Sequence, residues 1–396
     1  MTSMEWAARF AEMGARITER WRARRRDEAA FPEIAQRVLE ETDLGSDVDE
    51  LVLAMLAQDP LPWQSDPEAS FGQPPFTTFR GEDFFIEALF WIDGLITIHQ
   101  HSFSGAFSVF CGSSVHCRYR FTETSRVSSA MALGALELTD TELLVRGDVR
   151  PIHAGPALIH STFHLERPTV TIIVRTDTGR ESGPQYNYLP PSLALDPFQP
   201  RPAVTKRIQL LTMLHAARPD AYWRAAELTL ARADFHAAYL ILAEAWRTLE
   251  RAEDRARLFA IARATQGADL DLVLPVLEES AKKRAFVARR DGVTDDELRF
   301  VLALLLNVPK RAAIFDLLGE RFPGVAPTEV LLRNLQKLNF DEVGLSLAKF
   351  LMTGDSSRDA LKEHLARENV RFTNDYELLA CVRMFREAPG FGALFA

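Results

Sequence analysis

The sequence lacks several features that would each point to a particular class of protein. Cysteine is scarce, because three residues spread over a chain of 396 are too few and too scattered for a disulfide framework. No apolar run approaches the roughly 20 residues that a membrane-spanning helix needs. The first residues lack the basic start and continuous apolar stretch of a secretory signal peptide. We therefore expect a cytoplasmic protein with no membrane partner.

An excess of positive charge is also lacking. The formal net charge is −9 at pH 7, which argues against nucleic acid as the main partner. The one strongly basic run, residues 20–26, follows an amphipathic helical pattern. Cations at the end of a helix complement its dipole, so we interpret this run as a solvated helix terminus.

Hydrophobic periodicity divides the chain into three parts. Residues 1–60 place their large apolar side chains three or four positions apart, as amphipathic helices do. In residues 70–192 the period changes to two, in short runs separated by Gly, Asp, Ser and Pro, which is typical of a β-sandwich or barrel. Residues 204–396 return to helix-length apolar faces joined by short turns. We predict an α+β multidomain chain with N-terminal helices, a β-barrel and an all-helical domain of paired helices.

Histidine is concentrated in the β-rich part, where six of the nine histidines fall between residues 99 and 164. His99 and His101 stand one residue apart in a run that is otherwise typical of a buried strand. Residues i and i+2 of a strand face the same side, about 6.6 Å apart. Burying a polar ring without a partner costs free energy, and histidine is the commonest metal ligand. We interpret the pair as metal ligands; the alternative is two half-buried histidines bonded to the backbone.

The third ligand must come from elsewhere, and residues 153–164 offer three histidines. His160 and His164 share one face of a strand but lie about 13 Å apart along it, so both cannot reach one ion without a bulge. His153 is expected in a turn, and His116 is expected to be an ordinary strand-face residue. Spacing alone leaves His153, His160 and His164 open as the third ligand.

The residues around the histidine pair resemble the first motif of the cupin superfamily. That motif consists of glycine, five residues, His-x-His, three or four residues, glutamate, six residues and glycine. Here four residues separate Gly94 from His99, Gly105 stands in the place of the glutamate, and Gly112 closes the motif. The resemblance implies a cupin-type barrel, a double-stranded β-helix, over roughly residues 75–176.

A second stretch is similar to the second cupin motif, which is glycine, five residues, Pro-x-Gly, two residues, histidine, three residues and asparagine. Gly147 and five residues lead to His153-Ala-Gly155, and His160 follows after four more. His164 takes the place of the asparagine. By its place in the motif, the resemblance favours His160 as the third ligand. His164 would then be either a catalytic group that faces the substrate or a residue that supports a ligand.

A ligand set of three histidines without the glutamate resembles that of the thiol dioxygenases, the cysteine-dioxygenase-like branch of the cupins. This resemblance implies an Fe(II) centre with O₂ as co-substrate, acting on a small or carrier-bound thiol, amine or acid that ligates the metal. An arginine binds the substrate carboxylate in that branch, and Arg80 and Arg175 are the candidates here. Tyr188 is a candidate proton donor. Residues 169–176 lack the branch's Ser-x-His-x-Tyr run, so cysteine itself is not the expected substrate.

Ligand type leaves other functions open. Zinc or manganese at the same histidines would make a hydrolase or isomerase, since three imidazoles can hold zinc and acidify its water. A cupin without activity would be a binding or scaffold protein. Residues 204–396 contain no cluster of titratable side chains. We expect them to cover the barrel, to recognise a larger substrate or to form a homodimer.

Overall fold

The computed structural model describes residues 3–65, 72–92, 97–177, 183–355, 357–387 and 391–395. The strands are β1 (Pro75–Arg80), β2 (Phe84–Trp91), β3 (Ile98–His101), β4 (Gly105–Cys111), β5 (Ser114–Ser128), β6 (Met131–Leu144), β7 (Val149–Ile152), β8 (Gly155–His164), β9 (Thr169–Thr176), β10 (Asn187–Leu189) and β11 (Leu193–Leu195). The N-terminal helices are α1 (Ser3–Ala23), α2 (Phe31–Glu40) and α3 (Val48–Leu56), with a short 3-10 turn, η1 (Glu28–Ala30).

The C-terminal part is helical. Its elements are α4 (Pro202–Ala217), α5 (Pro219–Leu230), α6 (Phe235–Thr248), α7 (Ala252–Gln266), η2 (Ala268–Val273), α8 (Leu274–Asp291), α9 (Asp296–Asn307), α10 (Arg311–Arg321), α11 (Pro327–Lys337), α12 (Glu342–Leu351), α13 (Arg358–Arg367), α14 (Asp375–Glu387) and α15 (Gly392–Phe395). Several of these helices have an aspartate as N-cap. The side chains of Asp234, Asp295 and Asp341 each accept a hydrogen bond from the backbone N–H three residues further along the chain. The α+β architecture predicted from the hydrophobic periods is confirmed.

The β region consists of two antiparallel layers. One is a five-stranded sheet in the order β1-β2-β9-β4-β7, and the other is a closed barrel in the order β10-β11-β6-β5-β8-β3. A hydrophobic cluster lies between them, formed by Leu89, Trp91, Phe103, Phe107, Val109, Leu144, Ile152, Leu158 and Ile173. Two facing antiparallel layers around a buried interior agree with the cupin-type arrangement that the motifs imply.

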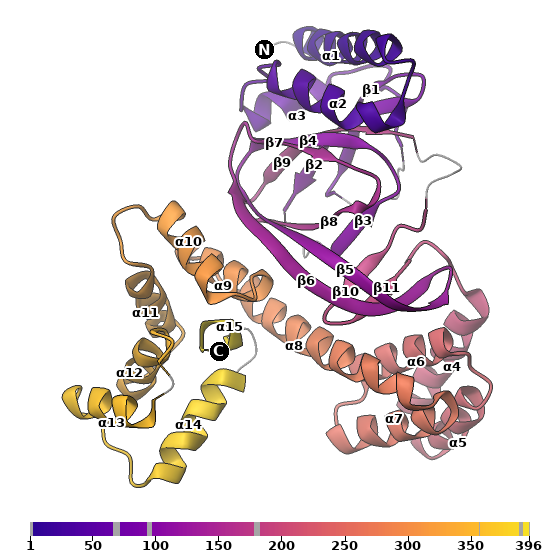
Figure 1. The fold of residues 1–396 in the computed structure, drawn as a ribbon. Coiled ribbons are helices and arrows are strands. Elements are labelled where there is room, and N and C mark those ends of the chain that lie inside the picture. The colour runs from indigo at the N-terminus through magenta and orange to yellow at the C-terminus, as the bar shows by residue number, and fades with distance from the viewer. Residues whose placement is uncertain are drawn as a thin grey trace.

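The N-terminal helices cover the outer face of the five-stranded sheet (Figure 1). The apolar stripe of α1 is buried there, and the sheet contributes alternate residues of β9, namely Val170, Ile172 and Val174. Because successive residues of a strand point to opposite faces, Thr171 and Ile173 point to the interior between the layers. One strand thus serves both the helix contact and the interior.

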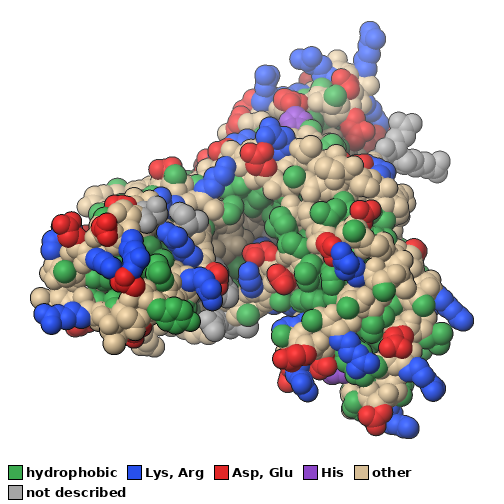
Figure 2. Space-filling model, turned by 60° about the horizontal axis from the view of Figure 1, so that its bottom comes forward, with side chains coloured by type: hydrophobic (Ala, Val, Ile, Leu, Met, Phe, Trp, Pro, Cys, Tyr) green, Lys and Arg blue, Asp and Glu red, His purple; other side chains and the backbone are tan. Residues whose placement is uncertain are grey.

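Some of the C-terminal helices, among them α6, α9 and α10, lie against strands β5 and β6 on the side away from the five-stranded sheet (Figure 1). The first group, α4 to α8, packs on Met131, Leu133 and Leu193, and the later helices pack on residues such as Val115 and Phe163. Figure 2 shows Lys and Arg side chains interspersed with Asp and Glu over the helical lobes, so this face carries no large area of one charge. No helix in the described ranges is long and apolar enough to cross a bilayer.

Candidate metal centre

Three histidines on neighbouring strands converge in the interior between the two layers. His99 on β3 is the direct partner of His160 on β8, and the register shifts before His101. One ring nitrogen from each residue lies within 4.8 Å of the others. The closest pair is His101 Nε2 and His160 Nε2, at 2.8 Å. All three side chains are buried, so this trio could hold a metal ion.

The three rings are neutral near pH 7, and a histidine must be neutral to bind a metal. Burial is the main cause that lowers the pKa of His99, and it lowers the pKa of His101 and of His160 well below the ordinary value. The His99 Nδ1–H donates to the carbonyl of Thr97 at 2.8 Å. Its proton therefore sits on Nδ1, and the lone pair of the neutral ring is on Nε2. A neutral imidazole nitrogen is the form that binds metals.

His164 lies in the same interior but outside the trio. Its ring stacks on Trp91, with centroids 4.4 Å apart and planes 15° apart, and its Nδ1 lies 2.8 Å from Ser114 Oγ. Burial lowers the pKa of His164 to about 3, so its ring is neutral. Its buried Nε2 has no hydrogen-bond partner in the described part of the chain. The sequence prediction that His160 and His164 cannot both join one ion site agrees with this arrangement.

The histidines line a cavity with mainly apolar walls. Its volume is about 40 Å³, and its other lining residues are Leu89, Trp91, Phe107, Ile152, Thr162, Thr171 and Ile173. None of the described lining residues carries a carboxylate. Sites for drug-sized ligands measure about 300–1,000 Å³, whereas a water molecule needs only about 10–15 Å³ measured in this way. The cavity therefore has room for an ion and one or two molecules of the size of water or O₂.

Gly105, which stands where the cupin motif has its glutamate, is packed too tightly against the neighbouring backbone to carry a side chain. A Cβ atom at Gly105 would lie 2.0 Å from the carbonyl oxygen of Val174, because β4 runs beside β9 at this point. A glutamate at position 105 would force β9 to move. The packing of the strands therefore leaves no room for a carboxylate ligand at position 105. Gly94, the first glycine of the motif, lies outside the described residues.

The two arginines proposed as substrate anchors both have carboxylate partners. Arg80 binds Asp177 through two hydrogen bonds of 2.5 and 2.7 Å. Arg175 donates to the buried Glu87 at 3.0 Å, and its guanidinium lies over the ring of Phe103, 5.0 Å from the centroid. Neither arginine lines the cavity. Arg175 lies on the same face of β9 as Thr171 and Ile173, which line the cavity, so it is nearer to the cavity than Arg80 is.

The side chain of Tyr188 on β10 points to the opposite face of the sheet from His99 and His101 on β3. It is the direct partner of Ile98, and its hydroxyl donates to Gln100 Oε1 at 2.5 Å. Because Gln100 alternates with His99 and His101, its side chain points away from them. Tyr188 therefore lies in a separate apolar cluster with Ile98 and Ile159 and does not reach the cavity. The geometry gives no support to Tyr188 as a proton donor at this site.

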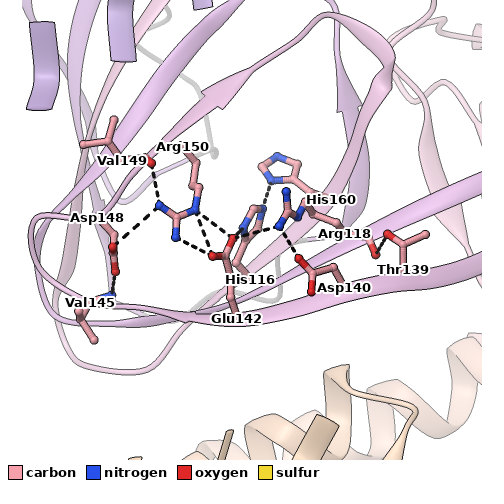
Figure 3. A network of polar contacts seen from close by, with 10 residues as sticks. All are labelled: His116, Arg118, Thr139, Asp140, Glu142, Val145, Asp148, Val149, Arg150 and His160. Atoms are coloured by element: carbon pink, nitrogen blue, oxygen red, sulfur yellow. Dashed lines mark hydrogen bonds and ion pairs between the residues drawn. The ribbon is translucent and has the colours of Figure 1, made fainter. Parts of the chain in front are cut away.

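Sequence reasoning missed the role of His116, which it treated as an ordinary strand-face residue. His116 Nε2 lies 2.9 Å from His160 Nδ1, and His116 Nδ1 lies 2.8 Å from Glu142 Oε1 (Figure 3). Arg150 in turn donates to Glu142. The sequence carried no signal for this group, because the pairing of His116 with Glu142 across the β5–β6 hairpin depends on a register that shifts at several points. His153 is 41% exposed and stays outside the cavity, as expected for a turn residue.

Comparisons with known proteins find distant likenesses among solved structures. No family model and no curated protein matches the chain. A chain from the crystal structures of the DMSP lyases RdDddP and RnDddQII is 17% identical, with 45% of this chain and 96% of that chain covered and a TM-score of 0.25. The DMSP lyase DddQ from Ruegeria pomeroyi DSS-3 is 15% identical (38% and 75% covered, TM-score 0.24). A recombinant oxalate oxidase in complex with glycolate is 14% identical (42% and 77% covered, TM-score 0.21). Likenesses at these TM-scores carry no conclusion about fold or activity.

Proposed function

We propose that this protein is an Fe(II)-dependent non-haem oxygenase of the cupin type, with His99, His101 and His160 as ligands and O₂ as co-substrate. The observation that carries the proposal is the convergence of three neutral imidazoles in one buried, apolar-walled cavity. When bound, ferrous iron would supply the positions at which O₂ and a ligating substrate group meet.

The nitrogen spacing supports a shared ion. Two nitrogens about 2.1 Å from one metal ion are separated by about 3.0 Å at a right angle and by about 3.4 Å at the tetrahedral angle. The 2.8 Å between His101 Nε2 and His160 Nε2 is close to this range, so a small movement of the two rings would let both bind one ion.

The remaining residues of the cavity have separate roles in this proposal. The apolar walls exclude bulk water and suit a small apolar molecule such as O₂. His164, neutral and held against Trp91, can exchange a proton with the substrate through Nε2. Because the cavity is only about 40 Å³, only the reacting end of a thiol, amine or acid enters it. We propose Arg175 as the group that would meet an acidic end of the substrate.

Oxygen consumption tests the proposal. Protein purified without air and loaded with Fe(II) is mixed with a panel of small thiols, amines and carboxylic acids, and O₂ uptake is recorded. Wild type and the exposed control His153→Ala should both consume O₂ with the right substrate, and His101→Ala should not. Turnover of the zinc- or manganese-loaded protein without O₂ would instead establish a hydrolase or isomerase.

A further inference from the structure

A line of hydrogen bonds connects His160 to a carboxylate outside the cavity. His160 Nδ1 meets His116 Nε2 at 2.9 Å, and His116 Nδ1 meets Glu142 Oε1 at 2.8 Å (Figure 3). Both rings are buried, whereas the Glu142 side chain is 23% exposed. The line therefore runs from the candidate ligand towards the surface of the barrel.

Strand order explains how a residue on β6 reaches a residue on β8. The barrel order places β5 between β6 and β8. His116 on β5 is paired with Glu142 on one side and with Thr162 on the other. Its ring thus bridges to His160, two positions from Thr162 on the same face of β8.

The direction of each hydrogen bond follows from the carboxylate. Burial alone would raise the pKa of Glu142, but hydrogen bonds from His116 and Arg150 outweigh it and lower that pKa to about 2. An ionised carboxylate only accepts, so His116 must donate from Nδ1. With the ring proton of His116 on Nδ1, its Nε2 is an acceptor, and the Nδ1 of His160 must donate to it. His160 is left with its lone pair on Nε2, the nitrogen nearest to His101.

We propose that Glu142, acting through His116, fixes the tautomer of His160 so that Nε2 is the metal-binding nitrogen. Glu142 and His116 are positioning residues, and their importance for metal binding rests on the proposed metal centre. The opposite tautomer of His116 would donate from Nε2 to His160 and leave a proton on the cavity-facing nitrogen of His160, which blocks it as a ligand. Hydrogen-bonded partners of this kind are known to orient ligating histidines.

Glu142→Gln is the discriminating variant because it keeps the shape and removes the obligatory acceptor. Arg150 donates to Glu142 at 2.6 Å and cannot accept. The amide oxygen of the variant should therefore turn to Arg150, and its NH₂ group should face His116. That orientation reverses both tautomers. Glu137→Gln on the same strand is the matched control, since Glu137 is exposed and pairs only with Arg120 among its described neighbours.

The test is nitrogen-15 NMR of metal-free protein labelled in histidine, at a pH where the rings are neutral. The His160 signals are assigned with the His160→Gln variant. In wild type and Glu137→Gln the ring proton of His160 should be on Nδ1, and in Glu142→Gln it should be on Nε2. A wild-type His160 protonated on Nε2, or an unchanged tautomer in folded Glu142→Gln, would overturn the proposal. The wild-type spectrum keeps the test decisive even where the variant does not fold.

Metal affinity is the second measurement. Co(II) titration followed by visible absorption should show binding about 10 to 100 times weaker in Glu142→Gln than in Glu137→Gln, the usual effect of losing such a partner. Equal affinities would contradict the proposed importance of Glu142. Failure of the wild type to bind Co(II), Zn(II) or Fe(II) would refute the metal centre, whereas the tautomer of the metal-free protein is measured independently of it.

Discussion

Acidification from pH 7.5 to 5.0 should destabilise the metal-free protein by about 2 kcal/mol through His164 alone. Burial lowers the pKa of His164 from 6.5 to about 3 in the folded protein. Between these values the unfolded chain binds a proton that the folded protein does not, so acid favours unfolding. The contribution of His164 to stability is complete above pH 6.5 and is lost as the pH falls towards 3. At pH 5.0 the loss covers about 1.5 pH units, at about 1.36 kcal/mol each.

Urea unfolding at both pH values, with chelator present, measures this loss. The comparison is His164→Asn, whose amide can keep the contact with Ser114 but does not titrate in this range. Because the other buried histidines titrate in both proteins, their contributions cancel in the difference. Wild type should lose about 2 kcal/mol more than the variant. An equal loss in the two proteins would refute the reasoning, since it would mean that His164 keeps an ordinary pKa when folded.

Three further predictions concern the metal, the strands and the buried ion pair. A metal at 100 times its Kd should stabilise the fold by about 2.7 kcal/mol, visible as a higher melting temperature that EDTA reverses; no shift would count against binding. Gly105→Ala should lower the free energy of unfolding, measured with urea, by more than about 2 kcal/mol, since its Cβ would meet Val174 O at 2.0 Å. An unchanged free energy of unfolding would show that β9 can move aside at little cost. Glu87→Gln should cost about 3 kcal/mol, because it leaves the charge of Arg175 without its buried partner; a loss under about 1 kcal/mol would show that water replaces the carboxylate.

Local patterns were sufficient to predict the elements and the histidine pair. The spacing of the apolar residues changes from three or four positions to two where the strands begin. This spacing depends only on which face of each helix or strand is buried, so the sequence alone shows it. His99 and His101 could be placed on one face for the same reason. Selecting His160 required the motif resemblance, and the structure brings this residue, not His153 or His164, into the trio.

Strand register is what the sequence could not supply. Tyr188 faces away from the cavity because it pairs with Ile98, a contact between residues far apart in the chain. His116 meets Glu142 across a long hairpin whose register shifts at several points, so counting residues along it does not predict the pair. Likewise, Gly105 looked like a lost ligand, and only its approach to Val174 shows why no side chain fits there.

Metal content is the most direct test of the central claim, which is that His99, His101 and His160 form one metal site. Wild type, His101→Ala and the control His153→Ala are purified without air and without added metal, and each is measured by inductively coupled plasma mass spectrometry. The account predicts equimolar iron in wild type and in His153→Ala, and none in His101→Ala. Absence of stoichiometric metal from the wild type even after reconstitution with Fe(II), or undiminished metal in His101→Ala, would contradict it.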